Sequence, residues 1–174
     1  EYVNPIWVDT WGSIEGSEYI YECKVDAQGD IFVAGRFSGT VDFGGIEKTA
    51  KGYSDIYLGK INSQGDWYWV ETIGQESSSA DVGFDLAIKQ SGDVVLVGQF
   101  AERIVFDENC DPPCNCDRSG EICTFIACFS TDTGSCNKCC CWGRSSVRGI
   151  VLDQSDYIYV VGRSDCPDNE WIEY

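Results

Sequence analysis

The stretch from Val25 to Phe37 reads Val-Asp-Ala-Gln-Gly-Asp-Ile-Phe-Val-Ala-Gly-Arg-Phe, and the chain repeats this pattern twice more. It returns at Ile88–Phe100 and again at Leu152–Arg163. Each copy carries a glycine near its end, and successive glycines stand 63 and 64 residues apart: Gly35, Gly98 and Gly162. A near-constant period of this size indicates stacked supersecondary units, none of which can bury its own apolar face alone.

The residues around each copy predict strands joined by tight turns. Tyr19–Val25 alternates its side chains with the period of two that a strand requires. The Gln28–Gly29 pair supplies a residue that tolerates positive φ, so a hairpin should lead into Ile31–Ala34. Further strands are expected at Asp55–Ile61 and Trp67–Gly74, and no segment carries a helical apolar stripe. These patterns predict an all-β fold of four-stranded antiparallel propeller-type blades.

The two ends of the chain are out of phase with the repeat. Trp7–Gly12 matches Trp69–Gly74, so the chain opens on a fourth strand whose blade is missing. The predicted parts are the last strand of a split blade, a first blade repeat, a second blade repeat and a partial third blade: residues 1–12, 13–74, 75–143 and 144–174. Asn169–Tyr174 is a candidate third strand of the partial blade. About two blades are therefore complete, and the third is split between the ends.

A family resemblance is carried by the first unit. The pattern W-x-x-x-W-G at Trp7–Gly12, followed by the stretches Asp26–Gly44 and Gly52–Trp69, resembles the SBBP-type repeat, which is related to seven-bladed β-propellers. The resemblance implies four-stranded blades around an axis, in secreted or surface-anchored proteins that mostly have no known catalytic activity. The second unit departs from the pattern, because a cysteine-rich insert replaces its Gly-Ser-Asp stretch and Phe129 falls opposite Lys60.

The composition disfavours several classes of function. Twelve basic residues against 29 acidic ones give a net charge of −17, whereas nucleic acid and anionic membranes need a basic partner face. No apolar run approaches the roughly 20 residues of a membrane-spanning helix, so no membrane insertion is expected. The chain has no histidine, which removes Ser-His-Asp and Cys-His nucleophile systems and His-containing metal sites. We therefore expect a protein that is not an enzyme.

Eleven cysteines give this chain the density typical of an oxidising compartment, which favours a secreted or cell-surface protein. Cys23 holds the repeat position of Leu86 and Ile150, so we expect a buried free thiol there. The remaining ten can pair as disulfides: Cys110, Cys114, Cys116, Cys123, Cys128, Cys136, Cys139, Cys140, Cys141 and Cys166.

Most of these cysteines lie in the insert at residues 110–141, which is expected to project from the second blade as an irregular, stapled loop. The competing hypothesis is a zinc or copper site, with thiolates from Cys114, Cys116 and the triplet at residues 139–141. The spacing does not match paired zinc knuckles, which favours disulfides, although their connectivity cannot be read from the sequence.

Two further groups of residues suggest ligand binding. Calcium is the one cofactor that the acidic residues near the insert could hold: Asp107, Glu108, Asp111 and Asp117. Their spacing follows no EF-hand, and a solvated acidic loop is the simpler interpretation. The tryptophans could stack on glycans, but their recurrence at equivalent strand positions favours packing between blades.

The sequence thus predicts an extracellular, non-enzymatic structural or adhesive propeller-repeat protein whose subunits build a filament or surface appendage head to tail. Its partners would be copies of itself or flanking blades of a longer chain, with Trp7, Trp11 and Trp171 as the candidate assembly residues. The alternative is a ligand-binding propeller domain, for a glycan or calcium, within a larger surface receptor or secreted enzyme. A third hypothesis is a hydrolase or lyase module whose active site lies on other blades.

Overall fold

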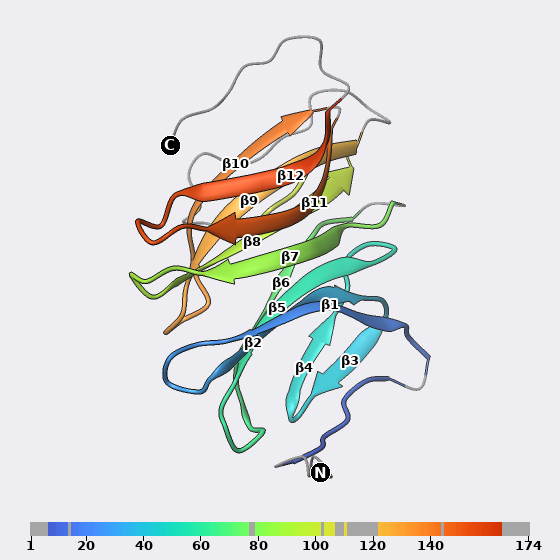
Figure 1. Ribbon diagram of the computed structural model, residues 1–174. Helices are drawn as coiled ribbons and strands as arrows, with labels where there is room; N and C mark the ends of the chain where they lie inside the picture. The colour runs from blue at the N-terminus through green and yellow to red at the C-terminus, as the bar shows by residue number, and fades with distance from the viewer. Residues whose placement is uncertain are drawn as a thin grey trace, which may run out of the picture.

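The structure, a computed structural model, consists of β-sheets stacked one upon another (Figure 1). It describes residues 7–13, 15–76, 79–101, 103–106, 110, 122–143 and 145–164. Within these ranges there is no helix, and the strands of every sheet pair antiparallel. The predicted all-β fold with antiparallel four-stranded sheets is therefore confirmed.

The first sheet contains the four strands that the repeat predicts, in the order β1-β2-β5-β6. Their bounds are β1 Glu18–Val25, β2 Ile31–Phe37, β5 Asp55–Ile61 and β6 Trp67–Ile73. A short hairpin that the sequence analysis did not predict stands between β2 and β5: β3 Thr40–Phe43 and β4 Ile46–Thr49. Gly44 and Gly45 both have positive φ, which lets so short a hairpin turn. The hairpin lays Val41 and Phe43 onto the first sheet, where both are buried.

The second sheet has the same arrangement, in the order β7-β8-β9-β10. Its strands are β7 Val82–Ile88, β8 Asp93–Ala101, β9 Ile122–Ser130 and β10 Cys136–Gly143. The prediction of an irregular projecting loop over residues 110–141 is wrong for residues 122–141, because most of these belong to β9 and β10. Alternate side chains of β9 point into the core, among them Cys123, Phe125 and Phe129. Their period-two apolar pattern makes this segment a core strand in spite of its cysteines.

The third sheet has two strands, β11 Ser145–Leu152 and β12 Ile158–Ser164. They correspond to β1–β2 and β7–β8, since all three pairs are antiparallel hairpins with the same break in register. The candidate third strand at residues 169–174 lies outside the described residues.

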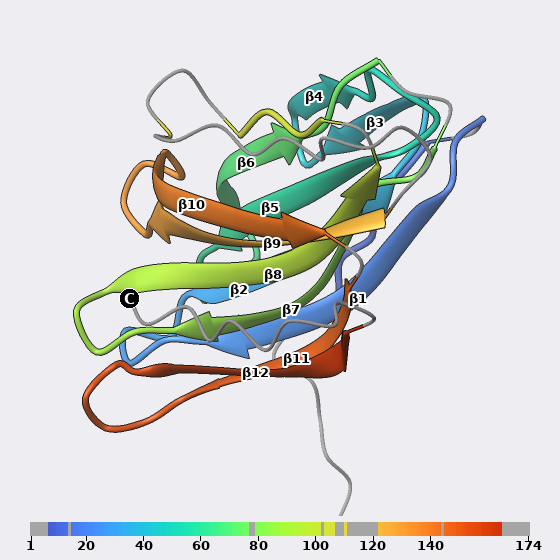
Figure 2. The same cartoon turned by 90° about the horizontal axis from the view of Figure 1, so that it is seen from above.

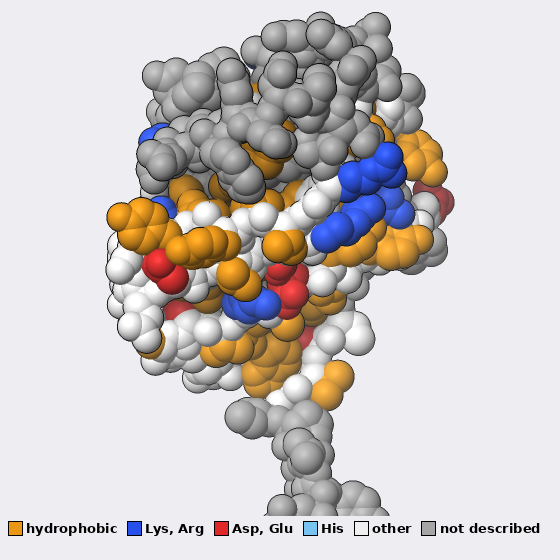
Figure 3. Space-filling view, turned by 45° about the horizontal axis from the view of Figure 1, so that its top comes forward, with side chains coloured by type: hydrophobic (Ala, Val, Ile, Leu, Met, Phe, Trp, Pro, Cys, Tyr) orange, Lys and Arg blue, Asp and Glu red, His pale blue; other side chains and the backbone are white. Residues whose placement is uncertain are grey.

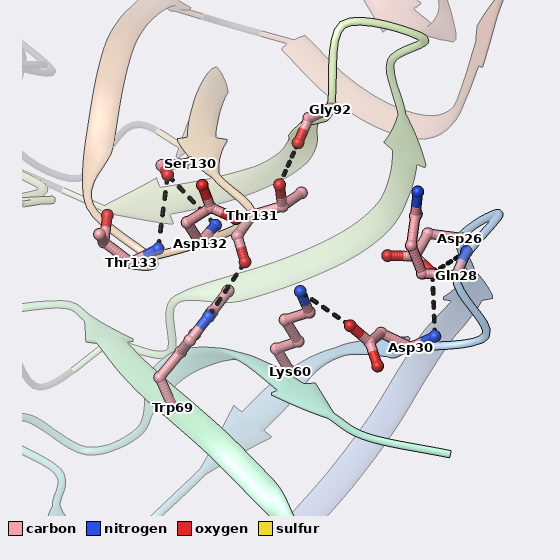
Figure 4. Close-up of polar contacts among 10 residues, drawn as sticks. All are labelled: Asp26, Gln28, Asp30, Lys60, Trp69, Gly92, Ser130, Thr131, Asp132 and Thr133. Atoms are coloured by element: carbon pink, nitrogen blue, oxygen red, sulfur yellow. Dashed lines mark hydrogen bonds and ion pairs between the residues drawn. The ribbon is translucent and has the colours of Figure 1, made fainter.

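Three hairpin turns, those of β1–β2, β5–β6 and β11–β12, are each held by a side-chain oxygen at their first position. The Asp26 carboxylate accepts hydrogen bonds from the backbone N–H groups of Gln28 and Asp30, both at 2.9 Å (Figure 4). Asn62 and Asp153 hold the corresponding turns with the same pair of contacts. Such side chains offer the backbone a ready-made turn. The D-x-x-G pattern at Asp26 and the N-x-x-G pattern at Asn62 thus mark hairpin turns of the repeat.

The sheets stack face to face, with β7 between β1 and β11 (Figures 1 and 2). We call the face of each sheet toward the preceding unit its N-side face, and the opposite one its C-side face. Eighteen of the described residues form the buried core between the first and second sheets, among them Phe32, Ile56, Leu86, Leu96 and Phe125. Because each large apolar side chain gains about 1.5–3 kcal/mol on burial, these contacts between sheets are the main source of stability.

Candidate functional site

The feature that the chain builds repeatedly is the contact of one sheet with the next. Between the first two sheets, Ala34 and Leu58 on the C-side face meet Leu86 on the N-side face. Between the second and third sheets, Val95 and Val97 meet the N-side residues of the β11–β12 pair: Val147, Ile150 and Val160. A single type of surface is therefore used twice within one chain.

Polar contacts fix how the second and third sheets are placed. The Asp156 carboxylate accepts hydrogen bonds from the N–H groups of Gln90 (2.8 Å) and Ser91 (3.2 Å) in the preceding turn. Asp156 stands where the other turns have glycine and keeps that conformation, with φ of 62°. The Asp85 carboxylate accepts a further bond from the N–H of Ile150 at 2.8 Å. These contacts add orientation to an interface that is otherwise apolar.

A β-bulge recurs at the same place in the first strand of each of the three stacked sheets. Strand pairing skips Tyr21, Phe84 and Arg148, because the register shifts around each of them. The three side chains form a column across the sheets. The Tyr21 and Phe84 rings meet edge to face with centroids 5.9 Å apart, and the Arg148 guanidinium lies 4.7 Å from the Phe84 centroid. A bulge re-aims one side chain without ending the strand, and here it links the units.

The N-terminal segment lies on the N-side face of the first sheet in the manner of an outer strand. The Trp7 indole donates to the Ser63 carbonyl at 2.9 Å, as the Trp69 indole donates to the Thr131 carbonyl at 3.3 Å (Figure 4). Trp7 also packs over the turn glycine Gly65, as Trp69 packs over Gly134. Trp7 therefore makes the same two contacts with the first sheet that Trp69 of β6 makes with the second sheet. Apart from one bridge between Gly12 and Asp42, residues 7–13 are not strand.

The two ends of the stack leave apolar side chains uncovered. The prediction that Cys23 is buried is wrong: its thiol is free and exposed. The repeat register behind that prediction holds, because Cys23 pairs with Val33 as Leu86 pairs with Leu96. Leu86 is covered by the first sheet, whereas the described chain has no sheet in front of Cys23. At the other end, Tyr159 of β12 is exposed.

The cysteine cluster lies against the core of the second sheet. A disulfide joins Cys110 to Cys136, whose Cα atoms are 5.3 Å apart, and Cys123 is also disulfide-bonded. The sulfurs of Cys110, Cys136 and Cys139 lie within 4.8 Å of one another, and all three residues are buried. A metal would need thiolates, and the disulfide removes two of the three. The disulfide therefore ties Cys110 to the first residue of β10.

Cys128 departs from the predicted set of disulfides, because its thiol is free and half-buried on β9. Burial is the main cause that raises the pKa of this thiol above its ordinary value, with smaller effects of Lys89 and Asp93. Strand pairing also corrects the alignment of the repeats. Lys60 pairs with Phe32 as Cys128 pairs with Val95, so Cys128 and not Phe129 holds the position of Lys60.

The buried polar groups of the described residues hold the chain in place. The buried Asp55 carboxylate accepts the N–H groups of Lys51 (2.9 Å) and Gly52 (3.2 Å), which fixes the loop before β5. The ammonium group of Lys60 forms an ion pair with Asp30 at 2.9 Å beneath the first turn (Figure 4). These groups form loop and turn contacts, and none gives the arrangement of a nucleophile beside a base.

Several predicted site residues lie outside the described part of the chain. They comprise the calcium candidates Asp107, Glu108, Asp111 and Asp117, three cysteines, Cys114, Cys116 and Cys166, and the assembly candidate Trp171. Of the assembly candidates, Trp7 and Trp11 both pack against the core of the first sheet. Within the described residues, no helix is long and apolar enough to cross a membrane.

Comparison with known protein-family models gives no match, and comparison with curated proteins gives none either.

Sequence reasoning missed the residues that lock the units together. Asp85 belongs to no recognisable sequence motif. It follows the bulge at Phe84, and its carboxylate accepts the hydrogen bond from Ile150 of the next sheet. Tyr21, Phe84 and Arg148 share one repeat position, so a strict alignment of the copies could have grouped them. Their chemical difference concealed the equivalence. Asp156 was visible as the departure from the turn glycine, but the partner of its carboxylate depends on how the sheets stack.

Proposed function

We propose that this chain is an extracellular, non-enzymatic structural or adhesive protein of the β-propeller-repeat type, whose units assemble head to tail into a filament or surface appendage. The stacked four-stranded sheets are the blades of this proposal. The cysteine content and the Cys110–Cys136 disulfide support an oxidising compartment.

One observation carries the proposal. The chain makes the same sheet-to-sheet contact twice, and it leaves an N-side face at one end and a C-side face at the other. Proteins rarely leave such surfaces and sheet edges bare. A contact between two different faces of identical subunits is heterologous, and it produces a ring when its rotation closes or a filament when it does not.

The N-terminal segment supports the same arrangement. Trp7–Gly12 has the sequence of a fourth strand, and it lies where a fourth strand of a preceding sheet would lie. The third sheet has two described strands, and no outer strand of this sheet is among the described residues. We propose that the segment of one copy completes the third sheet of its neighbour, with backbone hydrogen bonds giving affinity and Trp7 and Trp11 giving specificity.

The test is the assembly state of the purified, oxidised chain, followed by sedimentation velocity and electron microscopy over a wide range of protein concentration. We expect the intact chain to form ordered rings or filaments as its concentration rises. A chain without residues 1–12 should remain folded by circular dichroism but monomeric. The matched control, a chain without residues 1–6, keeps both tryptophans and should still assemble. The proposal is wrong if the chain without residues 1–12 assembles at the same concentration as the intact one.

A further inference from the structure

One repeat position is buried in the second and third sheets and uncovered in the first. Cys23, Leu86 and Ile150 lie at the same register on the N-side faces of their sheets. Leu86 and Ile150 are 0% and 5% exposed, because a preceding sheet covers each of them. Cys23 is exposed, and on the same face Ile20 and Val25 are 55% and 63% exposed. The N-side face of β1 therefore has the apolar character of a contact surface without its partner.

The C-side face of the third sheet, at the other end of the stack, is also uncovered. Tyr159 holds the position of Val95, and Val161 holds that of Val97, as the pairing with β11 and β7 shows. The two valines of the second sheet are 0% exposed beneath the third sheet. Tyr159 and Val161 are 54% and 64% exposed, and the neighbouring Val151 is equally uncovered. Figure 3 shows one side of the molecule, on which exposed apolar side chains lie among polar and charged ones.

These two surfaces are the halves of the contact that the chain already makes internally. Within the chain, Ile150 packs against Val95 and Val97. In a contact between copies, Cys23 would pack in the same way against Tyr159 and Val161 of the other copy. The surface needed on each side is present on every copy, so a second copy of this chain is the occupant that fits. The column of Tyr21, Phe84 and Arg148 would also continue from one copy to the next. Arg148 of one copy would lie beside Tyr21 of the other, and a guanidinium packs well on a tyrosine ring.

The N-terminal segment leaves this surface accessible. Trp7 and Trp11 pack with Phe37, Phe43 and Val70, toward the β3–β4 hairpin and the outer strands of the first sheet. β1, at the other edge of that sheet, remains exposed on its N-side face. A strand pair of a neighbour can thus lie over the exposed side chains of β1, and the segment at residues 7–12 can flank it on the outer side. On β2 the N-side residues Val33 and Phe37 are already buried within the chain.

We infer that the C-side face of β11–β12 in one copy packs on the exposed N-side face of β1 in a second copy, which buries Cys23 against Tyr159 and Val161. This inference rests on the proposed head-to-tail assembly and names the surfaces that make it. It also gives the exposed thiol of Cys23 a role as the small apolar side chain that the contact requires.

The native thiol of Cys23 allows a direct test. In the full chain carrying Val161→Cys, mild oxidation with copper phenanthroline should join copies through Cys23 and position 161. A ladder of cross-linked chains is expected on non-reducing electrophoresis, with the linked peptides identified by mass spectrometry. Adding Cys23→Ser to Val161→Cys should abolish the ladder. The matched control is Tyr53→Cys, a similarly exposed site in the loop before β5. Cross-linking of Val161→Cys no stronger than this control overturns the inference.

A second variant reads the same contact without oxidation. Val161→Glu places an unpaired charge in the proposed interface and should weaken self-association by about tenfold or more, whereas Tyr53→Glu should leave it unchanged. If the intact chain assembles but neither variant at position 161 responds, the faces named here are wrong and the proposed function stands. If the intact chain stays monomeric at every concentration, the proposed function fails as well, and a further repeat unit of a longer chain becomes the occupant of these faces.

Discussion

Leu86 and Cys23 occupy the same position in two sheets that have the same strand order, yet one is completely buried and the other is exposed. The strands on which they lie have the same bulge and the same pairing register. The difference comes from the neighbour: the first sheet covers Leu86, and no described sheet covers Cys23. In a stacked array, the burial of a residue is thus a property of the contact between units and not of the unit itself.

The largest expected effect tests this comparison directly. Leu86→Ala removes a side chain from the core between two sheets and should lower the free energy of unfolding by about 2–5 kcal/mol. Cys23→Ala should change it by no more than about 0.5 kcal/mol in the monomer, because an exposed side chain loses little burial. Denaturant unfolding at a concentration below that of assembly measures both. Equal losses would mean that Cys23 is covered in the monomer.

The disulfide distinguishes the second sheet from the first. Replacing both cysteines of the bridge, Cys110→Ala with Cys136→Ala, should cost about 2–4 kcal/mol, since the bridge closes a segment of 26 residues in the unfolded chain. Thermal unfolding followed by circular dichroism measures the loss. Cys23→Ala is the matched control, because it removes a thiol and no bridge. An unchanged midpoint in the double variant would show that the staple contributes nothing.

The two docked tryptophans can be compared through the glycines beneath them. Gly134→Ala would place a Cβ 2.8 Å from the Trp69 ring at a φ of 76° and should cost more than the roughly 1–2 kcal/mol of backbone strain alone. Gly65→Ala, with Trp7 at 3.3 Å, should cost less. The control is Gly45→Ala, where φ is 96° and no atom lies near. The order of the three unfolding midpoints checks the equivalence of the two tryptophans, and an equal loss at all three glycines would contradict it.

The smallest effect concerns the thiols of Cys23 and Cys128. Burial raises the pKa of Cys128, so at neutral pH a smaller fraction of it is thiolate, the form that reacts. Iodoacetamide should therefore modify Cys23 first, and modification of Cys128 should increase only at more alkaline pH. Peptide mapping of the folded chain across the neutral to alkaline range measures both rates. Equal rates at neutral pH would contradict the burial of Cys128.

Much of the fold was predictable because the repeat carries its own physical signals. The period, the turn residues and the alternating strands located the four strands of the first sheet closely. The β3–β4 hairpin was missed because its strands are four residues long and follow a stretch that reads as one continuous strand. In the second unit, attention to the cysteines hid the alternation of Phe125, Ala127 and Phe129, which is the ordinary signal of a core strand.

The candidate site was less predictable, because it lies between units. The alignment of Cys23 with Leu86 was right, but a buried thiol does not follow from it unless a neighbour is present. The same limit applies to Asp85 and Asp156, whose carboxylates bind N–H groups on another sheet 65 or 66 residues away. Periodicity identifies equivalent residues, whereas the contacts that make them differ depend on how the sheets meet.

The edge-to-face pair of Trp11 and Trp67 gives this protein an optical signature. Their ring centroids are 5.1 Å apart and their planes meet at 84°. At this separation the electronic transitions of two indoles couple, and a fixed angle between them produces a pair of circular dichroism bands of opposite sign. The coupling disappears when residues 7–13 leave the first sheet. The ultraviolet spectrum can therefore report, without any label, whether the N-terminal segment of each molecule is seated.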